Sequence, residues 1–159
     1  MTTITEFGDG QLTVTRVYNA PIEEVFEAWI ETSKLKKWWG CAECVDVQSE
    51  VEPRLGGKYN HHMTLETEYG RHEQPGFATL VEYDPPRKLA YTSNEQGDEM
   101  VISVNFNSVE GGTKVTLVHS RIPNMKVDGG VDLHDIIRGG WTAAFEKLAR
   151  LFERADAVL

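Results

Sequence analysis

An apolar stripe with helical spacing lies near the start of the chain, and a shorter one follows it. Five apolar side chains recur at i, i+3, i+4, i+7 and i+8, which predicts an amphipathic helix that begins at Pro21. These side chains are Ile22, Val25, Phe26, Trp29 and Ile30. A second short helix is predicted to carry Leu35, Trp38 and Trp39 and to stop at Gly40, because glycine adopts the left-handed conformation easily.

Alternation of apolar and polar positions predicts strands along the middle of the chain. The alternating segments are residues 11–18, 44–51, 58–66, 77–83, 89–92, 100–106 and 115–119. The polar stretch from Glu68 to Gly76 is predicted to be a hairpin loop, and Asp84-Pro85-Pro86 a tight turn. Short turns between consecutive strands are typical of an antiparallel sheet.

A long helical pattern over residues 131–155 follows a predicted loop around Asn124 to Gly130. Its stripe has a period of 3.6 and contains Leu133, Ile137, Trp141, Ala144, Phe145, Leu148, Leu151 and Phe152. Gly139 and Gly140 lie inside this pattern, where each costs about 1 kcal/mol relative to alanine. We predict one α+β domain over residues 1–159, in which an antiparallel sheet of about seven strands wraps around the long C-terminal helix and two short helices follow the first strand.

Composition and charge narrow the classes of partner. The formal net charge of −9 argues against nucleic acid, whose phosphates require clustered Lys and Arg. Neither a membrane-spanning run nor a signal-peptide pattern occurs in the sequence, so we expect no membrane partner and a cytoplasmic location. Two cysteines are too few for a disulfide framework, and both are expected as thiols.

The apolar and aromatic side chains between the two predicted layers indicate either a packed core or the lining of a cavity. If Tyr59 and Met63 face the helix, alternation places His61 inside and His62 outside, and Leu117 likewise brings His119 inside. Such a lining with a few polar groups is typical of a small-molecule site. The candidate ligand-binding residues are Trp38, Trp39, Tyr59, His61, Met63, Phe77, Tyr91, Met100, Ile102, Leu117, His119, Trp141 and Phe145.

The sequence gives weaker evidence for catalysis, a metal site or a redox pair. His61 and His119 could form an acid–base pair, because imidazole titrates near neutral pH. Cys41 and Cys44 have the spacing of a metal half-site or redox pair, but they follow the C-terminal end of a helix, which is the wrong end to lower the pKa of a thiol. His61 and His62 could supply the other metal ligands, but adjacent residues of a strand point to opposite faces. The sequence therefore predicts no metal and no cofactor, and the glycine pairs lack the spacing of a phosphate loop.

Several motifs, in order along nearly the whole chain, resemble a known family. They are Ala20-Pro21, Trp38-Trp39-Gly40, Arg54-x-Gly56-Gly57-x-Tyr59, residues 84–92 (DPPRKLAYT), Gly112-Thr113-x-Val115-Thr116-Leu117, and Gly140-Trp141 followed by Leu148. The chain resembles the activator of heat-shock-protein-ninety ATPase homologue family, within the START-like (helix-grip, SRPBCC) superfamily. The family often has Asp-Pro-Arg before the double glycine, where this chain has Glu52-Pro53-Arg54.

The resemblance implies a helix-grip fold and leaves three classes of function open. Superfamily members bind apolar small molecules between sheet and helix, which makes binding of an apolar or amphipathic ligand the first hypothesis. Some members are cyclases or hydrolases, so the second is an enzyme that uses His61 or His119. The third is a cochaperone-type domain that contacts a chaperone through its surface.

Overall fold

The computed structural model describes residues 2–93, 100–123 and 125–157. Within them, six strands form one antiparallel sheet in the order β1-β2-β9-β8-β7-β6. Their bounds are Ile4–Gly8 (β1), Gln11–Tyr18 (β2), Ala78–Asp84 (β6), Lys88–Ser93 (β7), Met100–Val109 (β8) and Gly112–Ser120 (β9). Along β2 every second side chain is buried, as the alternation predicted. The register pairs Val14 with Leu117 across β2 and β9, so both lie on the core face.

Three further strands form a second antiparallel sheet in the order β3-β4-β5. They are β3 (Cys44–Val51), β4 (Tyr59–Thr67) and β5 (Gly70–Gln74). A single bridge between Lys58 and Thr79 and the paired hydrogen bonds of Leu80 with the backbone of residues 56 and 57 attach this sheet to β6. The two sheets therefore make one bent wall.

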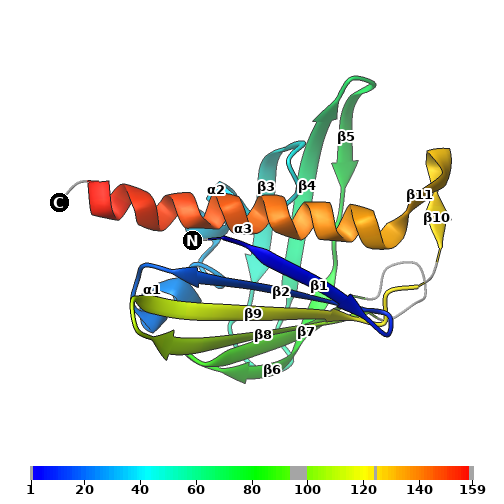
Figure 1. Cartoon of the computed structure of the whole chain (residues 1–159). Helices are drawn as coiled ribbons and strands as arrows, with labels where there is room; N and C mark the ends of the chain where they lie inside the picture. The colour runs from blue at the N-terminus through cyan, green and yellow to red at the C-terminus, as the bar shows by residue number, and fades with distance from the viewer. Residues whose placement is uncertain (1, 94–99, 124, 158–159) are drawn as a thin grey trace.

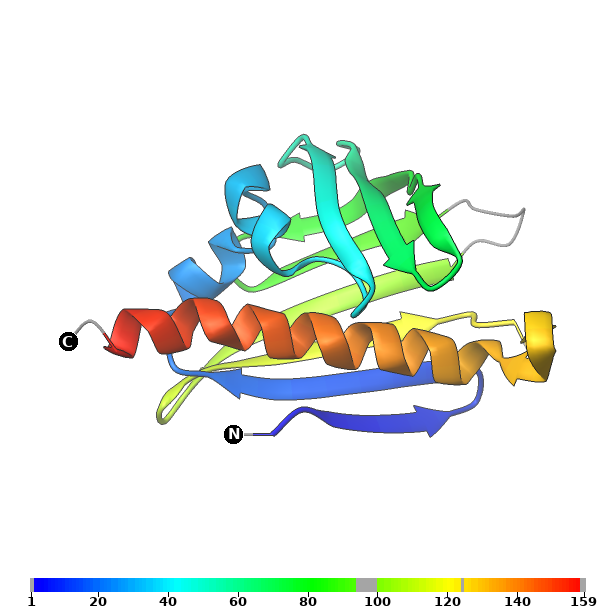
Figure 2. The same cartoon turned by 90° about the horizontal axis from the view of Figure 1, so that it is seen from above.

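The long helix α3 (Leu133–Ala157) crosses the concave side of this wall (Figure 1). Figure 2 shows β3, β4 and β5 along the flank of α3 opposite β1. Two short helices, α1 (Ile22–Glu27) and α2 (Thr32–Trp38), follow β2. A small hairpin of β10 (Lys126–Val127) and β11 (Val131–Asp132) around the turn η2 (Asp128–Gly130) leads into α3. No helix in these described ranges is long and apolar enough to cross a membrane.

The core lies between the six-stranded sheet, α1, α2 and the C-terminal half of α3. Its largest fully buried side chains include Trp29, Trp38, Phe106, Phe145 and Leu148. The hydroxyl of Tyr18 donates a hydrogen bond to the carbonyl oxygen of Phe145 at 3.1 Å, and Arg16 forms an ion pair with Glu146 at 2.7 Å. These contacts hold the middle of α3 against β2.

The α+β helix-grip architecture is confirmed, but several details differ from the sequence-based expectation. The sheet of about seven strands is two sheets, and β1 was not predicted because it has no buried alternation. The expected hairpin loop at 68–76 contains β5, an edge strand whose five residues are all exposed and so carry no apolar signal. The first helix ends at Glu27, although its apolar stripe runs to Ile30. Gly40 has the expected positive φ of 96°, and Asn124 lies outside the described residues.

Candidate functional site

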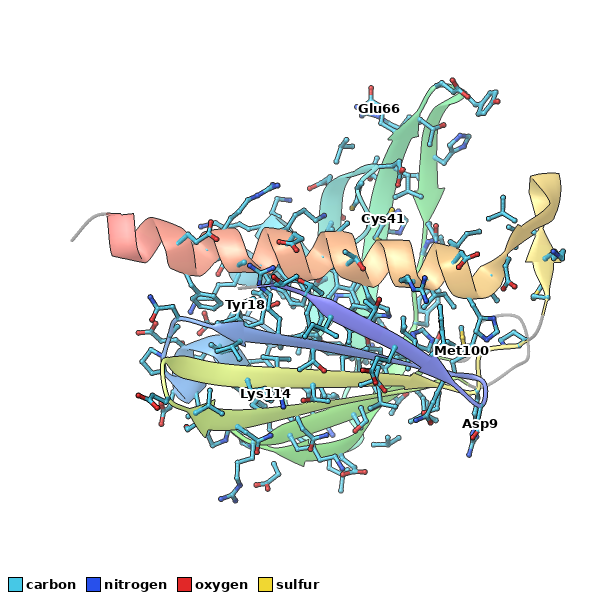
Figure 3. All side chains as sticks on the ribbon, in the orientation of Figure 1. Asp9, Tyr18, Cys41, Glu66, Met100 and Lys114 are labelled. Carbon is cyan, nitrogen blue, oxygen red and sulfur yellow. The ribbon has the colours of Figure 1, made fainter. Side chains whose placement is uncertain are left out.

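A cavity of about 740 Å³ lies between the two sheets and the N-terminal half of α3. Ten of the thirteen predicted site residues line it: Trp39, Tyr59, His61, Met63, Phe77, Tyr91, Met100, Ile102, His119 and Trp141. They come from β4, β7, β8, β9 and α3 and from the residues directly beside α2 and β6. Figure 3 labels Met100, one of these residues, at the start of β8. Phe77 is 64% exposed and lies at the rim, whereas Tyr59 has no exposed surface.

Three predicted residues do not line the cavity. Trp38 has no exposed surface and donates its indole N–H to the carbonyl oxygen of Ala28 at 2.8 Å, so it packs behind Trp39. Leu117 and Phe145 belong to the closed core, where α3 lies against β2. The structure does not bring these three to the cavity, because an inward direction along a strand or helix does not say whether the facing layer touches the side chain.

The sequence reasoning missed a second set of lining residues. They are Gly40, Cys41, Ala42, Glu43, Leu65, Gln74, Pro75, Gly76, Ala78, Ser93, Asp135, Ile136, Ile137, Gly139, Gly140 and Ala144. The glycine pair in α3 was the usable signal, since glycine inside a helix often accompanies a close approach or an open space. A Cβ at Gly139 would meet no atom within 4 Å, and one at Gly140 would lie 3.9 Å from the Cβ of Cys41.

His61 faces the cavity from β4 and is 5% exposed. Its ring stacks on the indole of Trp39 with centroids 3.9 Å apart, and its Nδ1 lies 2.8 Å from the hydroxyl oxygen of Ser49 on β3. Its Nε2 is buried and has no hydrogen-bond partner. Burial lowers the pKa of His61 to about 3, so the ring is neutral at pH 7.

His119 faces the cavity from β9 and is held in a single tautomer. The indole N–H of Trp141 donates to His119 Nδ1 at 3.0 Å. An indole nitrogen can only donate, so Nδ1 must keep its lone pair and the proton of the neutral ring lies on Nε2. That Nε2 is 3.2 Å from the sulfur of Met100. Burial lowers the pKa of His119 to about 4.

All four tryptophans of the chain gather beside the cavity. Trp29 packs against Trp38 with centroids 4.6 Å apart, and Trp39 meets Trp141 edge-on at 5.7 Å. The hydroxyl of Tyr59 donates to the carbonyl oxygen of Trp29 at 2.7 Å, which satisfies the phenol of a fully buried side chain. The aromatic wall is therefore rigid and closely packed on its protein side.

The Cys41–Cys44 segment forms a half-buried turn beside the cavity, with both cysteines as free thiols. Burial raises the pKa of both thiols, which keeps them protonated at pH 7. The ammonium of Lys147 donates to the carbonyl oxygens of Trp39 and Cys41, each at 3.2 Å, and so ties this segment to α3. Among the residues that the structure describes, no cluster of three or more His, Cys, Asp or Glu side chains could hold a metal ion.

His62 lies on the opposite face of β4, as the alternation predicted. Its Nε2 is 2.8 Å from the Glu73 carboxylate, in a polar hollow of about 500 Å³ on the outer side of β3, β4 and β5. Ser49 lies in the wall of the same hollow. Its hydroxyl nevertheless points to the cavity side, because Ser49 is paired with His61 in the register of β3 and β4 and directly paired side chains share one face of a sheet.

Comparison with solved structures supports the same architecture. A protein from Chromobacterium violaceum shares 22% identity and a TM-score of 0.76, with 91% of this chain and 99% of that chain covered. One from Rhodobacter sphaeroides shares 18% identity and a TM-score of 0.75, covering 97% and 99%. An AHSA1-like protein from Aeromonas hydrophila shares 21% identity and a TM-score of 0.68, covering 92% and 94%. Identities this low show the fold alone.

Comparison at the level of sequence identifies the family. No curated protein matches the chain. The family model described as Activator of Hsp90 ATPase homolog 1-like protein matches residues 19–153, from the end of β2 almost to the end of α3. Because that match spans most of the chain, the protein belongs to the family of Activator of Hsp90 ATPase homolog 1-like proteins.

Proposed function

We propose that this protein binds an apolar or amphipathic small molecule in the cavity between the bent wall and α3. The cavity carries the proposal, because a volume of about 740 Å³ with mostly aromatic and aliphatic lining matches the usual small-molecule site. Members of this family and fold commonly bind hydrophobic ligands.

The lining residues divide into two roles. Trp39, Tyr91 and Trp141 offer rigid aromatic surface, and burial of such surface contributes about 25 cal/mol per Å². Met63 and Met100 offer flexible thioethers that adjust to the outline of a ligand. The predicted binding residues Phe77, Ile102, Tyr59, His61 and His119 complete this wall, and Trp38, Leu117 and Phe145 support it from behind.

The two histidines are better suited to orienting a ligand than to transferring protons. With pKa values lowered by burial to about 3 and about 4, His61 and His119 have no proton to give as acids at pH 7. The same low pKa makes each a weak base. The lowered pKa values of both rings therefore favour binding over acid–base catalysis.

Titration with N-phenyl-1-naphthylamine, an uncharged dye that fluoresces in apolar surroundings, tests the proposal. We expect saturable binding of one dye per chain. Gly140→Leu places a side chain at the cavity wall and should weaken binding at least tenfold. Leucine is a better helix former than glycine, so this loss would not come from a weakened helix.

Ala143→Leu on the same helix is the control, because Ala143 does not line the cavity. It should bind the dye as the unchanged protein does. Native mass spectrometry of the freshly purified protein should show a retained small molecule. The proposal fails if the unchanged protein shows neither saturable dye binding nor a retained molecule.

A further inference from the structure

The charged side chains that line the cavity are both acidic. Glu43 and Asp135 line it, and both are exposed at its rim. No lysine or arginine is among the described residues that line it. The ammonium of Lys147 donates hydrogen bonds to the carbonyl oxygens of Trp39 and Cys41, and Lys147 does not line the cavity.

The interior of the cavity carries no charge. Both imidazoles are neutral, and burial raises the pKa of the Tyr59 and Tyr91 phenols well above its usual value, so both stay protonated. An ionised carboxylate would find no cation there. Moving an unpaired carboxylate out of water into such surroundings is strongly unfavourable.

One polar atom of the lining lacks a partner. Of the buried side-chain nitrogens and oxygens without a hydrogen bond in the described chain, His61 Nε2 is the one that belongs to a cavity-lining residue. An unpaired buried polar atom is costly, and a hydrogen bond from a ligand removes that cost. Nε2 has almost no accessible surface, so a ligand reaches it only if a neighbour moves. Met63, two residues further along β4 on the same face, has the flexible side chain for such a movement.

The Ser49 hydroxyl makes His61 adaptable. A hydroxyl can donate to Nδ1 or accept from it, so His61 Nε2 can carry either a lone pair or an N–H. His119 cannot do this, because Trp141 holds it in one tautomer. His61 can therefore either donate a hydrogen bond to a ligand hydroxyl or accept one from it.

We propose that the cavity selects uncharged amphiphiles that carry a hydroxyl group, which bonds to His61 Nε2, and rejects the corresponding carboxylates. This inference rests on the proposed function and names the class of ligand that the same site takes. It makes His61 the residue that determines specificity, while the aromatic wall supplies affinity for the apolar part.

Three probes with one ring system test it by isothermal titration calorimetry at pH 7.5: naphthalene, 2-naphthol and 2-naphthoate. We expect 2-naphthol to bind about tenfold more tightly than naphthalene, which corresponds to one hydrogen bond. We expect 2-naphthoate to bind at least a hundredfold more weakly than 2-naphthol. Glu43→Gln combined with Asp135→Asn should increase the affinity for 2-naphthoate only a few-fold, because both carboxylates lie at the exposed rim, where solvent and salt screen their charges.

His61→Phe isolates the hydrogen bond, because phenylalanine keeps an aromatic ring beside Trp39 and lacks Nε2. It should bind naphthalene as before and lose the tenfold preference for 2-naphthol. His62→Phe, the same substitution on the outer face of β4, is the matched control and should keep the preference. In the unchanged protein, the ¹⁵N resonance of His61 Nε2 should shift with 2-naphthol and not with naphthalene, a readout that does not depend on any variant folding.

The outcomes separate the two proposals. If none of the three probes binds, the proposed function fails and the inference with it. If naphthalene binds but 2-naphthoate binds as tightly as 2-naphthol, the inference alone is overturned. It is also overturned if the His61 Nε2 resonance does not respond to bound 2-naphthol, or if a folded His61→Phe protein keeps the tenfold preference.

Discussion

Burial decides the state of the two cavity histidines. His61 and His119 are 5% and 7% exposed, and no carboxylate accepts a hydrogen bond from either in the described chain. Desolvation therefore acts on each ring without compensation and favours the neutral form. Neutral imidazole offers both a donor and an acceptor nitrogen, which suits recognition of an uncharged polar group.

The same burial makes stability depend on pH. In the unfolded chain each histidine takes up a proton near its ordinary pKa of 6.5, whereas the folded protein resists protonation of His61 to about pH 3 and of His119 to about pH 4. The unfolded state thus binds more protons below pH 6.5, and stability is full above that value and falls as the pH is lowered. Between pH 6.5 and 5 we expect a loss that steepens to about 1.4 kcal/mol per pH unit for each histidine as the unfolded chain becomes protonated.

Urea unfolding at several pH values measures this slope. His119→Gln removes one of the two buried imidazoles and should halve it. The window ends at pH 5 because carboxylates such as Glu73 and Asp132, whose hydrogen bonds lower their pKa, begin to protonate below it. A stability that does not change across the window would show that these imidazoles titrate normally.

The indole N–H of Trp141 is a second feature with a measurable consequence. Trp141→Phe leaves His119 Nδ1 without its donor, so we expect the free energy of unfolding to fall by about 1 kcal/mol more than in Trp39→Phe. Trp39→Phe is the control, because it also removes an indole that lines the cavity. The pKa of His119 should rise in Trp141→Phe, since Nδ1 becomes free to accept a proton; NMR titration of the ring reads this directly. An unchanged His119 titration would contradict it.

At the scale of elements, α3 has two halves with different surroundings. Its C-terminal half packs through Phe145, Leu148 and Phe152, while Gly139 and Gly140 border the cavity. Gly139→Ala should raise the free energy of unfolding by about 1 kcal/mol, because alanine favours the helix and its Cβ meets no atom within 4 Å.

Gly112→Ala is the contrasting substitution. Gly112 has a φ of 141°, and a Cβ there would collide with the carbonyl oxygen of Tyr18. We expect a clear loss of stability in the same urea experiment. If Gly139→Ala also destabilised the protein, the glycine would be required by a contact that the structure does not contain.

The strands show where an alternating pattern can be relied on. β2, β8 and β9 have one buried face, and their predicted positions agree with the structure. β1 and β5 are edge strands with almost no buried side chain, so backbone pairing with a neighbour forms them without any apolar signal. The division into two sheets was not predicted either, because no pattern of apolar and polar residues shows where one sheet ends and another begins.

At the scale of the whole molecule, a small cluster joins the N-terminal strands to α3. The guanidinium of Arg16, 7% exposed, donates to Glu146 and to the hydroxyl of Thr3. Glu146→Gln should lower the free energy of unfolding by about 2 kcal/mol, because it leaves a buried cation without its anion. The exposed Lys58–Glu50 pair is the control, and Glu50→Gln should change thermal unfolding little. Equal effects of the two substitutions would show that Arg16 is solvated.

The sequence by itself determined the order of the main strands and helices, their inward faces, and ten of the residues that line the cavity. It could do so because each of these depends on local periodicity. Only the tertiary structure decided which inward side chains meet another layer and which border open space. Trp38, Leu117 and Phe145 are packed, whereas Trp39, His61 and Trp141 face the cavity. The physical reason is that Tyr18 and Arg16 hold the middle of α3 against β2, so the open space remains beside its N-terminal half. The distance between two layers depends on such contacts, and no pattern within one segment contains it.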